Sequence, residues 1–246
     1  MTGSNEVVAS SPVDSQRAAT IALAGSVVLV AAMLVMGALG HVFVFEGPIG
    51  RAELEWTDWV AQHRVGVLDA VATVGSSLTD TWTVIGVAFG ASVILWVTGN
   101  RRHASLLPIG LAVELAAFLA VSTIIGRERP DVTPLGSVPS TASFPSGHVA
   151  AGVVLYGGLA LIAASVTGSN AVTRGASIPA AVVITYVATA RIYEGVHHPT
   201  DVVGGALLGI GALFVAASST GLMAPARRTS GARASGGRRA LKATGP

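Results

Sequence analysis

Two histidines and an aspartate in the second half of the chain have the types and spacing needed for nucleophilic and acid–base catalysis. His148 and His197 carry the side chains best suited to proton transfer near neutral pH. Asp201 follows His197 by four residues, and Pro199 lies between them. If Pro199 opens a helix, we expect Asp201 to accept from one imidazole nitrogen and to aim the other at a substrate. The spacing therefore predicts a histidine nucleophile oriented by a carboxylate.

Groups suited to binding an anion lie close to these residues in the sequence. Arg129 and Arg191 carry planar guanidinium forks that match phosphate oxygens. Ser146 and Gly147 lie where a helix is expected to begin, so free backbone N–H groups and the helix dipole favour an anion there. The predicted phosphate-binding residues are Arg129, Arg191, Ser146 and Gly147, with Arg127 as a further candidate.

The elements that must position these residues are membrane spans. The chain is 51% hydrophobic and only 11% charged, whereas soluble domains carry about 25% charged residues. It has no cysteine, which excludes disulfides and thiolate metal sites. A transmembrane helix needs about 20 mostly apolar residues, and six segments approach or exceed this length: Ala18–Phe45, Thr81–Asn100, Ala104–Gly126, Val149–Thr173, Gly175–Ala190 and Val202–Ala226. The predicted fold is an all-α bundle of six transmembrane helices.

The polar segments around these spans complete the predicted organisation. Between the first two spans, Trp56 and Trp59 lie among charged residues, which favours a helix in the membrane interface. Residues 1–17 are predicted to be a disordered cytoplasmic N-terminus, 18–226 the six-span domain, and 227–246 a basic, disordered cytoplasmic tail. A basic tail beside a membrane favours contact with anionic lipids over nucleic acid.

The basic residues also predict the orientation. With the N-terminus inside the cell, ten of the 15 Lys and Arg residues lie in cytoplasmic segments, as the positive-inside rule requires. Both termini are then cytoplasmic and the protein is a multi-pass protein of the plasma membrane. The predicted catalytic and phosphate-binding residues converge at the extracytoplasmic ends of the spans.

The motifs resemble those of the type 2 phosphatidic acid phosphatase superfamily, which also includes vanadium haloperoxidases. The resemblance extends from Leu68 to about Leu208. It rests on Arg129-Pro130, on Pro145-Ser146-Gly147-His148, and on Arg191, His197 and Asp201 in the spacing Arg-x5-His-x3-Asp. Two positions depart from the family pattern, because Ser122 stands where the family has lysine and Ala190 where it has serine. Arg127 is close enough to replace the missing lysine as a phosphate contact, as a hypothesis.

This resemblance implies a mechanism without a metal or another cofactor. His197 would attack phosphorus and form a phosphohistidine, while Asp201 orients His197. His148 would protonate the leaving group and then activate water. Arg129, Arg191, Ser146 and Gly147 would hold the phosphoryl oxygens, where charge accumulates in the transition state.

The expected activity is hydrolysis of a lipid phosphate, with membrane lipids as surroundings and no nucleic-acid partner. Candidate substrates are polyprenyl diphosphates such as undecaprenyl diphosphate, phosphatidic acid and phosphatidylglycerol phosphate. One alternative is a non-catalytic phospholipid-binding or transport protein, which Ser122 encourages. Another is a metal-dependent hydrolase using His148, His197, His198 and Asp201. An intramembrane serine protease with Ser146 as nucleophile would need glycine at position 144, where this chain has Phe144.

Two further residues are interpreted less specifically. Glu114 lies in the middle of the third span, where a carboxyl serves either packing or substrate access. His198 is expected to be an exposed neighbour of His197 near the lipid headgroups. The sequence sets no oligomeric state.

Overall fold

The computed structural model describes residues 12–223, and within this range all regular secondary structure is helical, with no β-strand. The predicted all-α class is confirmed. The elements are α1 (Pro12–Gly40), the π-helical η1 (His41–Phe45), α2 (Pro48–Gln62), α3 (Gly66–Ser77), α4 (Thr81–Val97), α5 (Arg101–Ala104), α6 (Leu106–Ile125), α7 (Gly147–Gly152), the π-helical η2 (Val153–Gly157), α8 (Gly158–Thr167), α9 (Asn170–Tyr193) and α10 (Pro199–Ser219).

Several of these helices are long and apolar enough to cross a membrane. Within the described range there are five such stretches, or six if α3 and α4, which are bent by 44°, form one span. The predicted count of six is the upper value of this range. α1 begins at Pro12, so residues 12–17, which were predicted to be disordered, are helical. Residues 1–11 and the predicted basic tail 227–246 lie outside the described residues.

The predicted boundary between the fourth and fifth spans is wrong by several residues. The helix that starts at Gly147 ends at Thr167, because Gly168 adopts the left-handed conformation (φ 61°) that closes a helix. Ser169 then caps α9, and its side chain accepts from the backbone N–H of Val172. Arg174 and the turn residues Gly168-Ser169-Asn170 were together expected to separate the two spans. Gly168 and Ser169 do so, and Arg174 lies inside α9.

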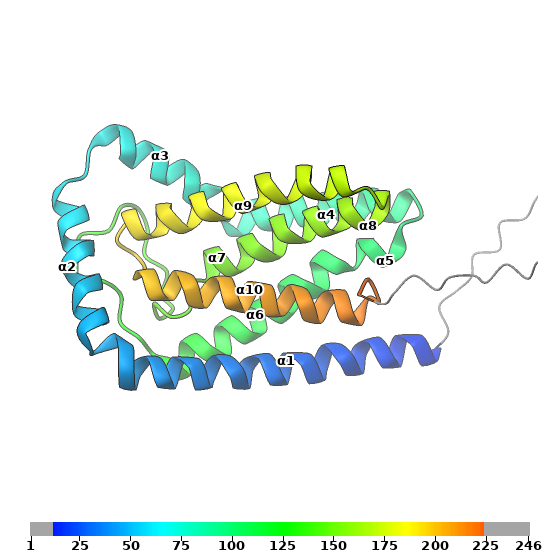
Figure 1. Ribbon diagram of the computed structural model, residues 1–246, viewed down its shortest axis with the longest axis horizontal. Coiled ribbons are helices and arrows are strands. Elements are labelled where there is room, and N and C mark those ends of the chain that lie inside the picture. The colour runs from blue at the N-terminus through cyan, green and yellow to red at the C-terminus, as the bar shows by residue number, and fades with distance from the viewer. Residues whose placement is uncertain (1–11, 224–246) are drawn as a thin grey trace, which may run out of the picture.

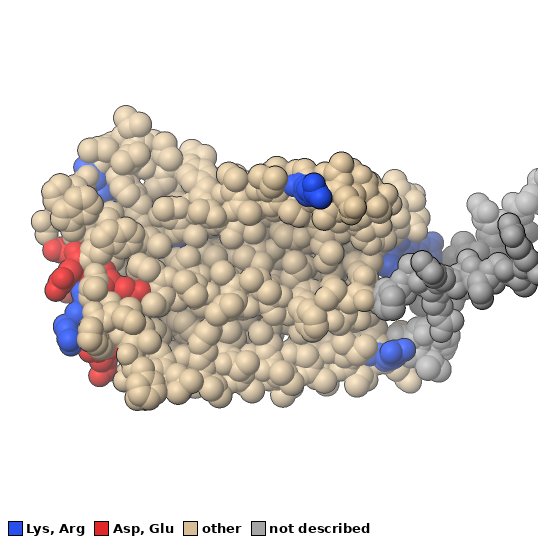
Figure 2. All heavy atoms as spheres, in the orientation of Figure 1, with Lys and Arg blue, Asp and Glu red and all other residues tan. Residues whose placement is uncertain are grey.

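The helices form an elongated bundle with its polar residues at the two ends. α1, α9 and α10 run along the long axis, and α2 crosses one end of the bundle (Figure 1). The first and last described residues lie at the opposite end (Figure 1). Figure 2 shows acidic and basic side chains gathered at the α2 end, basic ones at the other, and an almost uncharged belt between them. Large apolar side chains such as Leu23, Val28 and Phe89 are about 70% exposed around this belt, as expected where lipid is the solvent.

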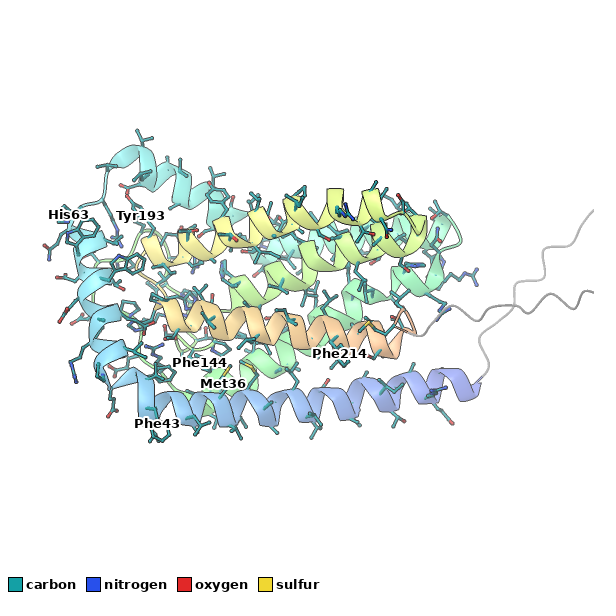
Figure 3. The ribbon with its side chains drawn as sticks, in the orientation of Figure 1. Met36, Phe43, His63, Phe144, Tyr193 and Phe214 are labelled. Carbon is teal, nitrogen blue, oxygen red and sulfur yellow. The ribbon has the colours of Figure 1, made fainter. Side chains whose placement is uncertain are left out.

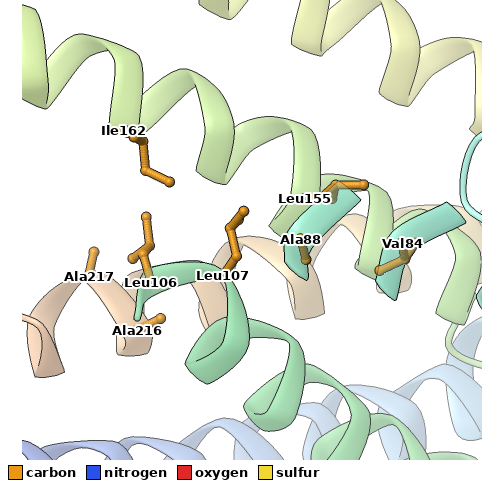
Figure 4. Close-up of a cluster of buried hydrophobic side chains, with 8 residues drawn as sticks. All are labelled: Val84, Ala88, Leu106, Leu107, Leu155, Ile162, Ala216 and Ala217. Atoms are coloured by element: carbon orange, nitrogen blue, oxygen red, sulfur yellow. The ribbon is translucent and has the colours of Figure 1, made fainter. Parts of the chain in front are cut away.

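One part of the interior is a cluster of apolar side chains from five elements. Leu106 and Leu107 at the start of α6 are essentially fully buried. They pack with residues from α4, η2, α8 and α10, which Figure 4 shows: Val84, Ala88, Leu155, Ile162, Ala216 and Ala217. This cluster fixes α4 and α6 against the helix that carries His148.

A row of glycines lets α10 approach α7 at backbone distance. A Cβ added to Gly205 would lie 2.3 Å from the carbonyl oxygen of Ser146, and one added to Gly209 would lie 2.6 Å from that of Ala150. Residues four apart face the same side of a helix, so this is the small-xxx-small packing of membrane helices. The close approach brings the first turn of α10, with Asp201, against the first turn of α7.

Candidate active site

The predicted polar clusters meet at the α2 end of the bundle. Backbone hydrogen bonds join the loop after α6 to the starts of α7 and α10. The Ser143 N–H donates to the Arg127 carbonyl at 2.8 Å, and the Ser146 N–H donates to the Asp201 carbonyl at 3.0 Å. Phe144 packs against α1 near Met36 at this end (Figure 3). Segments separated by about seventy residues in the sequence are therefore fixed around one place.

A cavity of about 380 Å³ opens at this place. Four of the predicted site residues line it: Arg129, Gly147, His148 and His197. The remaining walls come mainly from α4 and α6 and are mostly apolar: Thr79, Thr81, Val84, Ile85, Leu111, Glu114, Leu115, Phe118, Pro139, Thr141 and Ala151. The cavity thus combines a polar end bearing both histidines with an apolar flank.

His197 is held in one tautomer. Its ring is 2% exposed, and Nδ1 lies 2.8 Å from the carbonyl oxygen of Ser143. Because a carbonyl only accepts, Nδ1 carries the proton and Nε2 keeps its lone pair. Burial lowers the pKa of His197, against the opposing effect of the Asp201 carboxylate. A neutral imidazole with a free Nε2 is the form that can attack phosphorus.

Asp201 orients this histidine less directly than the spacing predicted. Its Oδ2 lies 3.8 Å from Nδ1 of His197, which is too long for a hydrogen bond. Oδ2 instead accepts from the Ser143 hydroxyl at 2.5 Å and from the His198 N–H at 2.8 Å. Ser143 thus contacts both residues, with its carbonyl on the histidine and its hydroxyl on the aspartate. As predicted, Pro199 is the first residue of α10.

Arg127 does not reach the cavity, which argues against a phosphate contact in place of the family lysine. Its Nη1 donates to Oδ1 of Asp201 at 2.5 Å, and its Nη2 donates to Oε2 of Glu53 at 3.0 Å. The guanidinium also lies 3.8 Å from the ring centroid of Phe45. Glu53 continues the network by accepting from the Thr200 N–H at 2.6 Å. Arg127 is therefore a buried counter-ion for two carboxylates.

His148 has an acidic neighbour that the motifs did not indicate. Its Nε2 lies 3.4 Å from Oδ1 of Asp80, the residue that precedes α4. The His148 side chain is 23% exposed and that of Asp80 is 57% exposed. His148 is thus the more accessible histidine, as a residue exchanging protons with substrate and water must be.

The two predicted phosphate-binding arginines are held in different ways. Arg129 donates to backbone carbonyls, with Nη1 at 2.6 Å from Val196 and Nη2 at 3.0 Å from Thr141. Burial and the neighbouring Arg191 lower the pKa of Arg129. Arg191 donates through Nη1 to Oε2 of Glu194 at 2.7 Å and to the Ser76 hydroxyl at 3.1 Å.

Arg191 and Ser146 both keep buried polar atoms without a partner. Nε and Nη2 of Arg191, and Oγ of Ser146, make no hydrogen bond to any described residue. Buried donors without acceptors cost about 1–3 kcal/mol each, so they are rare unless a ligand satisfies them. The first backbone N–H groups of the helix that starts at Gly147 add further donors. The donor set fits an anion with several oxygens.

The sequence motifs named four residues that line the cavity, but they did not indicate the residues that support them. His198 was expected to be exposed and is instead 4% exposed, at the start of α10. Burial lowers the pKa of His198. Within the described part of the chain, no group of three or more His, Asp or Glu side chains is arranged to hold a metal ion. The supporting residues that no motif signalled are Glu53, Ser76, Asp80, Ser143, Glu194 and Thr200.

Comparison with known proteins shows which sequences and structures this chain resembles. The sequence model described as the PAP2 superfamily matches residues 104–221. The decaprenylphosphoryl-5-phosphoribose phosphatase of Mycolicibacterium smegmatis is 32% identical over 123 residues, which are 48% of this chain and 61% of that protein. The aligned part is thus less than two thirds of that relative's length.

Two solved structures share the fold. The transmembrane PAP2 type phosphatidylglycerolphosphate phosphatase from Bacillus subtilis has a TM-score of 0.68 at 23% identity, over 82% of this chain and 98% of that one. LpxE from Aquifex aeolicus has a TM-score of 0.53 at 24% identity, over 67% of this chain and 94% of that one. The bundle that carries the site is thus a known membrane-protein architecture.

Proposed function

Because the chain belongs to the PAP2 superfamily, we propose that it is a multi-pass membrane phosphatase that hydrolyses a phosphomonoester or diphosphate on a lipid. The observation that supports this proposal is the position of His197 in the cavity. Its Nδ1 is tied to the Ser143 carbonyl, and it lines one cavity with Arg129 and His148. A fixed nucleophile, a cationic group and a more exposed histidine are the parts that phosphoryl transfer requires.

The reaction proceeds in two displacements. Nε2 of His197 attacks phosphorus, and the bond between phosphorus and the leaving oxygen breaks. His148 gives that oxygen a proton, and a phosphohistidine remains. His148 then takes a proton from water, the resulting hydroxide attacks phosphorus, and the P–N bond breaks to release inorganic phosphate and neutral His197.

The negative charge of the transferring phosphoryl group is balanced by fixed donors. Arg129 supplies a cation at the cavity wall, and Arg191 supplies its unpartnered Nε and Nη2. Ser146 and the N–H of Gly147 act at the start of the helix. Asp201, with Arg127 behind it, stabilises the imidazolium that develops on His197.

The substrate is a lipid because the cavity's flank faces the uncharged belt of the bundle. Ile85 of α4 and Leu115 of α6 line the cavity and are 50% and 53% exposed, so a hydrocarbon chain can leave the cavity sideways between these helices. The named activities of the relatives, on a decaprenyl-linked phosphate and on phosphatidylglycerolphosphate, agree with this class. We propose that the site lies at the extracytoplasmic face of the plasma membrane and both termini in the cytoplasm, since ten of the 15 basic residues fall in sequence segments expected on the other side.

Phosphate release by the detergent-purified protein tests the proposal. The panel holds undecaprenyl diphosphate, phosphatidic acid, phosphatidylglycerol phosphate and a soluble phosphate ester, each with and without EDTA. We expect release that survives EDTA and disappears in His197→Ala. The matched control is His63→Ala, which removes an exposed histidine at the end of α2 that does not line the cavity. No release from a folded protein that still binds phospholipid would favour the non-catalytic alternative.

A further inference from the structure

One acidic residue in the cavity wall has no role in the mechanism above. Glu114 of α6 is 5% exposed and lines the cavity. It makes no hydrogen bond or ion pair with any described residue. Glu114 therefore does not join the helices through a polar contact. A buried carboxyl without a partner is costly, and this one faces the space that the substrate must occupy.

The position of Glu114 along α6 sets its depth below the phosphate site. A Cβ added to Gly147 would lie 3.1 Å from the ring of Phe118, so Phe118 is level with the start of the helix that bears His148. One added to Gly110 would lie 2.8 Å from Val154. Glu114 lies between these levels, four residues or about 6 Å below Phe118 at 1.5 Å per residue.

This depth corresponds to the part of a bound lipid that follows the scissile phosphate. A substrate chain advances roughly 1.2 Å per covalent bond, so Glu114 faces atoms about five bonds from the phosphorus. The neighbouring wall at this level is apolar and includes Leu111, Leu115 and Val84. A carboxyl in such surroundings pairs with a neutral hydrogen-bond donor such as a hydroxyl.

We infer that Glu114 selects substrates in which a hydroxylated group, a sugar or glycerol, links the scissile phosphate to the lipid. This inference rests on the proposed lipid phosphatase function and narrows its substrate class. The preferred substrate is a phosphomonoester on a polyol headgroup, and a lipid monophosphate without this group is a poorer one.

The test uses one pair of lipids that differ in a linker hydroxyl and a second pair that differ in the whole hydroxylated linker. One pair is phosphatidylglycerol phosphate and its analogue lacking the central glycerol hydroxyl, and the other is a polyprenyl-linked pentose 5-phosphate and the polyprenyl monophosphate. We expect the hydroxylated member of at least one pair to have a kcat/KM about ten-fold higher in the wild type, as one satisfied buried hydrogen bond gives. The pair with the larger ratio identifies glycerol or sugar as the linker.

Substitutions at Glu114 assign this preference to its carboxyl. Glu114→Leu is expected to reduce the ratio to about one by slowing only the hydroxylated member, and Glu114→Gln, whose amide oxygen still accepts, to keep most of it. The matched control is Glu55→Leu on exposed α2, which should change neither rate. A wild-type ratio near one in both pairs, or an equal loss on both members in Glu114→Leu, would overturn the inference. The wild-type ratios stand even if a variant fails to fold, and absence of release from every lipid would instead refute the proposed function.

Discussion

Arg127 offers the sharpest test of how the site is held, because its two proposed roles predict different losses. As a phosphate ligand it would affect substrate binding, and as a counter-ion it would affect stability. Its guanidinium contacts Asp201 and Glu53 within 3.0 Å, and all three side chains are no more than 7% exposed. Arg127→Ala leaves two buried carboxylates facing each other without a cation.

The expected magnitude follows from the burial of these groups. Removing one partner of a buried ion pair costs about 3–5 kcal/mol, and exposure this low calls for little discount for solvent screening. Arg127→Ala should therefore lower the free energy of unfolding by about 3–5 kcal/mol. In the double variant Glu53→Gln/Arg127→Ala one orphaned carboxylate is removed, so part of this loss, about 1–2 kcal/mol, should be recovered.

Thermal unfolding in detergent, with all variants in the same detergent and lipid, measures these differences. Binding of orthovanadate, a phosphate analogue, is measured in parallel under conditions where each variant is folded. We expect vanadate affinity to fall far less for Arg127→Ala than for Arg129→Ala, whose guanidinium lines the cavity. An unchanged melting temperature together with weakened vanadate binding in Arg127→Ala would refute the counter-ion role.

Three further outcomes follow from the geometry. Burial lowers the pKa of His197, and the neutral ring is the nucleophile. We therefore expect kcat/KM to stay high as the pH falls to 6.5 and to drop only at lower pH, where the His197 ring is protonated. A pH–rate profile whose acid limb lies above 6.5 would contradict this. With p-nitrophenyl phosphate, whose leaving group needs no acid, His148→Ala should accumulate an acid-labile phosphoenzyme that His148→Ala/His197→Ala lacks, as seen by rapid-quench labelling. Gly209→Ala places a Cβ 2.6 Å from the Ala150 carbonyl oxygen and should lower the free energy of unfolding by about 1–3 kcal/mol, as measured by thermal unfolding. The control Gly86→Ala, whose added Cβ has no atom within 4 Å, should not destabilise the protein. Equal melting temperatures for the two variants would show that α7 and α10 do not need this contact.

The sequence predicted those features that a membrane imposes on a chain. Polar residues at the ends of apolar spans must lie at one of the two membrane faces. The order of the spans therefore predicted that His148 and His197 lie at the same face. The helix ends were less predictable. The turn residues Gly168 and Ser169 do lie between α8 and α9. The charged Arg174 was expected to belong to the same boundary and instead lies within α9.

The partners of the site residues could not be predicted, since they come from segments without a pattern. Glu53 is one of several charged residues on α2, and only its burial under Arg127 distinguishes it. In the sequence Asp80 has the position of a helix-capping residue before α4. It lies beside His148 because the start of α4 is close to α7 in the fold. Ser143 uses its carbonyl on His197, and a backbone contact has no signature in residue type.

The charge balance of the cavity links the departure at Ser122 to the choice of substrate. The family pattern has lysine at this position, and here a neutral serine is buried in α6. Arg127, the nearest replacement, is neutralised by two carboxylates. Arg191 is partly balanced by Glu194, which leaves Arg129 as the cation least compensated by acidic side chains. A site with this reduced positive charge suits an isolated phosphomonoester better than a diphosphate, whose adjoining second phosphate brings more negative charge to the same few cations. Restoring the family cation with Ser122→Lys should therefore improve kcat/KM for undecaprenyl diphosphate relative to phosphatidylglycerol phosphate. An unchanged ratio in the folded variant would show that cation number does not set this preference.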